Sequence, residues 1–199
     1  MVVERELEAV QALAAEKAVP LHLFQVDQPC EADLDPRRVS RIVRNLVVNA
    51  IEHAEGKPVE VHVAVNLNAV GVVVRDHGVG LTEAQLSRVF DRFWRADPAR
   101  ARTTGGTGLG LAIAVEDAGL HGGRIDVWGA PGQGASFRLV LPRTAGVTDL
   151  VAPVELVPDA AGEPGEGGEA PNWVVLDGPD PAALPDLGDE AAAGPEVAR

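Results

Sequence analysis

Four short polar motifs follow one another between residues 45 and 134, separated by helix-type and strand-type patterns. Each motif alone has an ordinary explanation: exposed or capping asparagines, an Asp-Gly turn, a hinge before a helix, or a hairpin turn. In this order, the same residue types suit a nucleotide pocket, and they constrain the fold more than any other feature. The motifs are Asn45 with Asn49, Asp76-His-Gly78-Val-Gly80, Gly105-Gly-Thr-Gly-Leu-Gly110 and Gly132-Gln-Gly134.

The apolar patterns around the motifs predict a mixture of helices and strands. Asp35 and Pro36 are typical of an N-cap and a first helical residue, and Thr82 with Gln85 forms a capping box. Residues 91–107 are rich in Arg, Gly and Thr, which predicts a mobile loop. We expect helices over 4–17, 36–54, 83–89 and 108–120, and strands over 21–26, 59–65, 70–75, 124–129 and 135–141.

Most of the net charge of −13 lies near the C-terminus. Residues 144–199 hold twelve Asp and Glu but one Arg, together with eight Gly and eight Pro. Such a composition does not bury enough surface to offset chain entropy, so we predict a disordered acidic tail over 143–199. Its apolar segment 172–177 is interpreted as a residual patch in a linker, with a docking motif as the less favoured alternative.

The bulk composition excludes several classes of protein. The sequence has no basic footprint for nucleic acid, and no apolar run approaches the roughly 18 residues of a membrane span. Its single cysteine, Cys30, cannot form an internal disulfide and fits a reducing compartment. The charged first residues do not resemble a signal peptide. We therefore expect a soluble cytoplasmic chain without a nucleic-acid partner or a membrane segment.

The polar motifs carry the chemistry. Asn45, Asn49 and His53 are spaced four apart and share one face of the expected helix 36–54. An amide oxygen is a hard ligand suited to Mg²⁺, which usually keeps several waters and phosphate oxygens. Asp76 follows a strand, where a carboxylate can accept a hydrogen bond from an exocyclic amine. Gly105–Gly110 opens a helix whose free N–H groups and dipole attract phosphate, and Thr107 can add a hydroxyl.

In combination, the motifs resemble the N, G1, G2 and G3 boxes of the ATP-binding domain shared by sensor histidine kinases, gyrase-type and Hsp90-type ATPases and MutL, the GHKL superfamily. Phe90-Asp-Arg-Phe93 resembles the F box, which points to histidine kinases. The stretches 92–98 and 110–118 are similar to the MtrB type of actinobacterial sensor kinase. The resemblance covers residues 4–142. It implies an α/β (α+β) two-layer sandwich with a mixed, mostly antiparallel five-stranded sheet and three main helices on one face, the Bergerat-type fold.

The resemblance also implies roles for individual residues. Asn49 would ligate Mg²⁺ with Asn45 in support, and His53 would approach the phosphates of ATP. Two departures are Glu52, where many relatives have Lys, and Ala135, where Ser or Thr is common. The remaining expected contacts are Asp76 with the adenine amino group, Gly78 and Gly80 along the ring, Arg92 and Arg95 at the γ-phosphate, and Gly106, Thr107, Gly108, Leu109 and Gly110 at the lid base and phosphate cradle.

Position 45 separates a kinase from an ATPase. Hydrolysing relatives have a Glu four residues before the Mg²⁺-binding Asn, and the amide of Asn45 cannot act as that base. Because a positioned base typically contributes about 10²–10⁴-fold, slow intrinsic hydrolysis is expected. None of the five histidines lies in a sequence typical of a phosphoacceptor helix. We therefore expect transfer to a His on a separate dimerisation domain, and from there to a response regulator.

The expected organisation is a linker helix over 1–20 that ends a dimerisation domain, a catalytic domain over 21–142 and the tail. The chain would be a fragment or truncated product of a parent kinase that is itself membrane-anchored. Four alternatives stay open. They are an anti-sigma-type serine kinase, which would lack the F box, a gyrase-like ATPase, which Asn45 disfavours, a degenerate nucleotide-binding module, and an α/β adaptor with an acidic tail.

Overall fold

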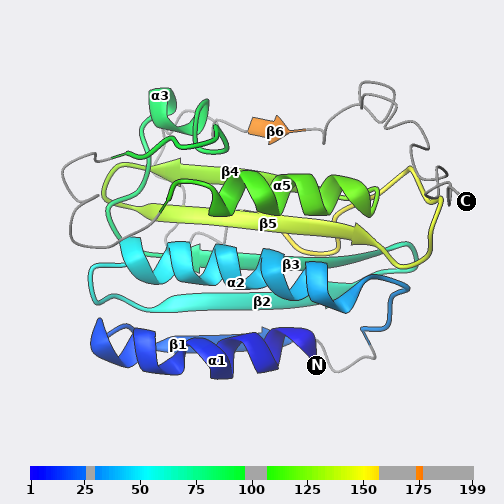
Figure 1. Ribbon diagram of the computed structural model, residues 1–199, viewed down its shortest axis with the longest axis horizontal. Helices are drawn as coiled ribbons and strands as arrows, with labels where there is room; N and C mark the ends of the chain where they lie inside the picture. The colour runs from blue at the N-terminus through cyan, green and yellow to red at the C-terminus, as the bar shows by residue number, and fades with distance from the viewer. Residues whose placement is uncertain (26–29, 97–106, 157–173, 177–199) are drawn as a thin grey trace, which may run out of the picture.

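The computed structural model describes residues 1–25, 30–96, 107–156 and, as backbone, 174–176. In this part of the chain the helices are α1 (Val2–Glu16), α2 (Pro36–His53), α3 (Glu83–Leu86) and α5 (Gly110–Leu120). The strands are β1 (Leu21–Gln25), β2 (Val59–Val65), β3 (Ala69–Asp76), β4 (Arg124–Ala130), β5 (Gly134–Pro142) and β6 (Val174–Leu176). The sheet forms one layer, and α1, α2 and α5 lie together on one of its faces (Figure 1). The predicted two-layer sandwich is confirmed.

The strand order of the sheet is β1-β2-β3-β5-β4-β6. β1 runs parallel to β2, and the other neighbouring pairs are antiparallel. The end of β3 lies beside the start of β2, where Asp76 is opposite Val59, and beside the start of β5, where Arg75 is opposite Ser136. The acidic residue after the predicted strand is therefore the last residue of β3, at one end of the sheet.

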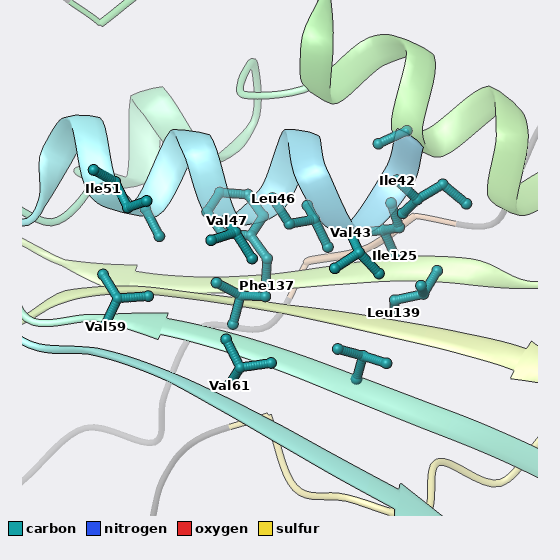
Figure 2. Packing of buried hydrophobic residues seen from close by; sticks show 14 of the residues in the cluster. Ile42, Val43, Leu46, Val47, Ile51, Val59, Val61, Ile125, Phe137 and Leu139 are labelled. Atoms are coloured by element: carbon teal, nitrogen blue, oxygen red, sulfur yellow. The ribbon is translucent and has the colours of Figure 1, made fainter. Parts of the chain in front are cut away.

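Helix α2 covers the middle of the sheet. Its N-terminus is capped as predicted, because the Asp35 carboxylate accepts a 2.8 Å hydrogen bond from the Arg37 N–H and Pro36 occupies the first turn. Figure 2 shows the apolar side of the helix packed onto strand residues that include Phe137. This core fixes the helix against the sheet. The buried helix residues are Ile42, Val43, Leu46, Val47, Ala50 and Ile51.

Two buried carboxylates tie the three main helices together. Asp117 on α5 receives hydrogen bonds from Arg41 (2.6 Å) and Arg38 (2.9 Å) on α2. Glu6 on α1 receives one from Arg44 of α2 at 2.9 Å. These bonds hold the pKa of the Asp117 and Glu6 carboxyls below their ordinary values, although burial acts in the opposite direction. The arginines of α2 therefore fix both neighbouring helices with ion pairs.

The structure differs from the prediction in the first part of the tail. Residues 144–156 are not disordered: the Leu156 side chain is buried, and Gly71 leaves room for the segment, since a Cβ there would lie 2.7 Å from Val154 Cγ1. Three side chains on the face of the sheet opposite the helices, and Asn66 in the turn after β2, donate hydrogen bonds to the backbone carbonyls of this segment. These are Arg124 to Leu150 (3.0 Å), Asn66 to Val151 (2.9 Å), Arg138 to Val154 (3.2 Å) and Ser136 to Leu156 (2.7 Å).

Three further predictions need correction. The sheet has a sixth strand, because β6 pairs with β4 from within the tail, in the apolar segment that the sequence analysis interpreted as a residual patch. The short helix after Thr82 ends at Leu86, although its capping box is present as predicted. The third main helix begins at Gly110, because Gly108 has a left-handed φ of +68° that is incompatible with a helix.

Candidate functional site

A cavity of about 510 Å³ opens between α2, the end of β3 and the start of α5. Its size is in the range of small-molecule sites. Five residues predicted from the sequence for catalysis and adenine recognition line it, namely Asn45, Asn49, His53, Asp76 and Gly80. The cavity is also lined by Arg95, Thr107 and Gly108, which precede α5, and by Gly110, the first residue of α5. Apolar walls and further polar groups come from Lys17, Val48, Glu52, Val79, Leu81, Val89, Trp94, Ala96, Leu111, Ala135 and Phe137.

Asp76 is the buried acid of the cavity, with 1% of its surface exposed. Its Oδ1 accepts a 2.9 Å hydrogen bond from the Gly78 N–H. Burial raises the pKa of the Asp76 carboxyl above its ordinary value, and backbone hydrogen bonds from Gly78 and Ala135 oppose that rise. A carboxylate has room for about four hydrogen bonds. Asp76 can therefore still accept one from a ligand in the cavity.

The glycines after Asp76 serve backbone packing. A Cβ at Gly78 would lie 1.8 Å from the His53 carbonyl oxygen, and one at Gly80 would lie 1.8 Å from that of Ala130. No side chain fits at such distances, so the loop after β3 can approach the end of α2 only with glycine at position 78. Gly80 lines the cavity, whereas Gly78 lies behind it, buried. Both glycines were expected to line the adenine ring, but only Gly80 is among the residues that line the cavity.

The polar face of α2 contributes Asn45, Asn49 and His53, as their spacing predicted. The Nδ2 of Asn45 donates a 2.9 Å hydrogen bond to the Gly110 carbonyl, which ties α2 to the first residue of α5. Within the described residues, the Asn49 amide has no hydrogen-bond partner. A half-buried amide without a partner at a cavity wall is suited to bind a ligand or a hydrated cation.

The glycine-rich motif lies partly in the cavity wall. Thr107, Gly108 and Gly110 line it, whereas Leu109 is the N-cap of α5 and is not among the lining residues. Gly108 contacts the F-box segment closely: its carbonyl accepts a 2.9 Å bond from the Phe93 N–H. A Cβ there would lie 2.9 Å from backbone atoms of that segment. Residues 97–106, which include Gly106 and most of the loop predicted as mobile over 91–107, lie outside the described residues.

The two predicted arginines are in different positions. Arg95 lines the cavity. Arg92 does not: it is an exposed residue whose guanidinium donates to Glu116 on α5, with a 3.2 Å bond from Nε. This bond raises the pKa of Arg92 above its ordinary value. An ion pair between residues so far apart in sequence leaves no signal in the sequence, so this pairing could not be predicted.

The described residues contain no cluster of three or more His, Cys, Asp or Glu side chains that could hold a metal ion. A divalent cation in this cavity would therefore depend on amide oxygen, water and the oxygens of a bound phosphate, which is the ligand set that Mg²⁺ accepts. The donor set of the cavity, a buried carboxylate, asparagine amides and glycine N–H groups beside apolar walls, fits a nucleotide with Mg²⁺.

The comparison with known families decides between the readings of this cavity. Residues 34–145 match the family described as "Histidine kinase-, DNA gyrase B-, and HSP90-like ATPase". The chain belongs to this family. The match begins immediately before α2 and ends after β5, so it includes most of the residues that line the cavity. ATP binding is the property that this family name implies for the cavity.

Among curated relatives, the chain is 48% identical to the sensor histidine kinase MtrB of Mycolicibacterium paratuberculosis over 173 residues, 85% of this chain and 30% of that protein. It is 51% identical to MtrB of Mycobacterium tuberculosis over 159 residues, 78% of this chain and 28% of that protein. The chain thus spans less than a third of these relatives. The resemblance to the MtrB type of kinase is confirmed.

Solved structures give the same family. Full-length ShkA in complex with AMPPNP is 27% identical with a TM-score of 0.62, covering 74% of this chain and 30% of that one. The mycobacterial sensor histidine kinase MprB is 27% identical with a TM-score of 0.61, covering 72% of this chain and 93% of that one. The histidine-kinase catalytic fold predicted from the sequence is therefore confirmed. No helix in the described ranges is long and apolar enough to span a membrane.

Proposed function

We propose that the chain is the ATP-binding catalytic domain of a two-component sensor histidine kinase. In this proposal it transfers the γ-phosphoryl group of Mg²⁺-bound ATP to a histidine on a dimerisation domain, which passes it to a response regulator. The names of the relatives support the class of activity. The observation that carries the proposal is the amide at position 45, which lines the cavity and is bound to the Gly110 carbonyl.

The residues of the cavity divide the work of binding. Asp76 accepts the hydrogen bond of the adenine amino group, while Leu81, Val89 and Phe137 enclose the apolar ring. Asn49, whose amide has no hydrogen-bond partner within the described residues, would offer its amide oxygen to Mg²⁺. When bound there, Mg²⁺ would neutralise negative charge on the phosphates. His53 on the next turn of α2 and Thr107 before α5 face the phosphate chain, and the N-terminus of α5 favours its negative charge.

The same geometry favours transfer over hydrolysis. A water molecule beside the γ-phosphate needs a base, and the amide of Asn45 cannot take a proton. An imidazole nitrogen needs no such base, because its lone pair attacks phosphorus directly as the bond to the β–γ bridging oxygen breaks. The imidazole then loses its N–H proton to solvent, and ADP leaves. Positioning and charge stabilisation supply most of the catalysis of such a step.

The acceptor lies on another domain in this proposal. The chain has five histidines. Two lie on strands, His22 and His62, and His53 faces the cavity. His77 and His121 follow β3 and α5 directly. None of these five histidines lies on an exposed helix face, where a phosphoacceptor histidine could meet ATP bound to another copy of the domain. A dimerisation domain that carries the acceptor is therefore the partner, and both act in the cytoplasm, where ATP and response regulators occur.

The test is phosphoryl transfer in trans. The chain is incubated with γ-labelled ATP, Mg²⁺ and a separately produced dimerisation domain of an MtrB relative. The expected result is acid-labile, base-stable label on that domain, with inorganic phosphate released more slowly than label is transferred. Two controls are matched to the mechanism: an acceptor domain with its histidine replaced by Gln, and the chain with Asn49→Ala. Label that appears only as inorganic phosphate would refute the proposal in favour of an ATPase.

A further inference from the structure

Lys17 lines the nucleotide cavity from outside the region that the family match covers. It is the C-cap residue directly after α1, and its N–H donates a 3.2 Å bond to the Leu13 carbonyl. Ala18 then turns the chain with a left-handed φ of +53°. This turn lies against the one that follows α2, since a Cβ at Gly56 would be 3.8 Å from the Ala18 carbonyl oxygen. The C-terminal ends of α1 and α2 thus meet at the cavity.

The charges at this end of the cavity are unbalanced for a nucleotide. Glu52 lies in its wall three residues after Asn49, and a carboxylate there repels phosphate. Among the described residues that line the cavity, the side chains of Lys and Arg type are Lys17 and Arg95. Lys17 is half-buried, and within the described part of the chain its ammonium has no hydrogen bond or ion pair. An unpaired cation in a concave wall attracts anions strongly.

We propose that Lys17 binds the phosphate chain of the nucleotide and replaces, from α1, the cation that is absent at position 52. The inference rests on the proposed function and deepens it. The flexible four-carbon side chain of Lys17 allows its ammonium group, at the end of α1, to reach phosphate oxygens as a point charge. The site is then completed by the helix that precedes the catalytic fold. Because α1 is tied to α2 through Glu6 and Arg44, its placement controls phosphate affinity.

The test compares ligands that differ only in their phosphates. Lys17→Ala and wild type are titrated by calorimetry with a non-hydrolysable ATP analogue, with ADP and with adenosine. Loss of one charged hydrogen bond predicts at least about a tenfold weaker affinity for the ATP analogue. Adenosine affinity should not change, and Lys17→Arg should retain most of the ATP affinity. The matched control is Lys57→Ala, which removes a lysine from the turn after α2 that does not line the cavity.

A charge relocation makes the test sharper. In the Lys17→Ala background, Glu52→Lys should restore the affinity for the ATP analogue. This substitution places a cation on α2, at the same end of the cavity from which the Lys17 cation was removed. Equal losses for all three ligands would overturn the inference, since they would indicate that Lys17 only shapes the cavity. Unchanged ATP affinity in Lys17→Ala would also overturn it while leaving the proposed function intact. A folded wild type that binds none of the ligands would refute the proposed function and the inference together.

Discussion

Asp76→Asn separates nucleotide recognition from folding. The buried carboxylate accepts the Gly78 N–H at 2.9 Å, and an asparagine Oδ1 can keep this bond. The other oxygen becomes an NH₂ group, which cannot accept from the adenine amino group. A hydrogen bond to a charged group contributes about 1.5–3 kcal/mol. The variant should therefore bind ATP about ten- to a hundredfold more weakly.

The same substitution should change the stability of the free protein only slightly. Burial raises the pKa of Asp76 in the folded state above its ordinary value of 3.8. The folded state therefore binds this proton more tightly, and stability falls as pH rises from 3.8 to the folded-state pKa. At pH 7 the wild type retains this cost of a buried charge, and asparagine lacks it. Asparagine can also lose the backbone hydrogen bond from Ala135, which opposes this gain. We expect the two effects to offset each other and the free energy of unfolding of the ligand-free variant to stay within about 1 kcal/mol of that of wild type.

The assay is a titration with a fluorescent ATP analogue, paired with urea unfolding of both proteins without ligand. We expect weaker binding with little change in stability. Equal affinities for wild type and Asp76→Asn would refute the assignment of Asp76 to adenine. Weaker binding accompanied by a large loss of stability would show that the substitution acts through the fold, and the hydrogen-bond argument would then fail.

Three further predictions concern the frame around the site. Leu156→Ala should cost about 2–4 kcal/mol in urea unfolding, whereas Val151→Ala, on an exposed neighbour, should cost less than about 0.5 kcal/mol. Asp117→Asn should lower the free energy of unfolding by about 1–2 kcal/mol near pH 7. The pKa of Asp117 in the folded state lies below its ordinary value of 3.8, so unfolding measured at a series of pH values should show this difference from wild type disappear in acid. Gly78→Ala should abolish nucleotide binding, measured by titration, because its Cβ meets the His53 carbonyl.

Features set by local residue order were predictable from the sequence. The cap at Asp35, the box at Thr82 and the shared face of Asn45 and Asn49 depend on spacing along one element, and the structure has all of them. The end of β3 followed from strand periodicity, which located Asp76. That the polar residues of α2 and β3 meet in one cavity depends on packing between distant segments, and it followed from the resemblance of the combined motifs to a known family.

Features that depend on contacts between distant segments were not predictable. Lys17 follows an amphipathic helix and has no motif around it, so only the meeting of two helix ends reveals it. Arg92 is held by Glu116 on α5, and this pairing depends on the folded loop. The segment up to Leu156 is bound through its backbone carbonyls, which every residue has. Its acidic, Gly- and Pro-rich composition therefore indicated disorder where the sheet in fact holds it.

A crystal structure of the chain with Mg²⁺ and a non-hydrolysable ATP analogue tests the central claim most directly. We expect the adenine amino group within hydrogen-bond distance of Asp76 and Mg²⁺ coordinated by the amide oxygen of Asn49. A nucleotide bound elsewhere on the molecule, or one in the cavity whose adenine does not contact Asp76, would contradict it.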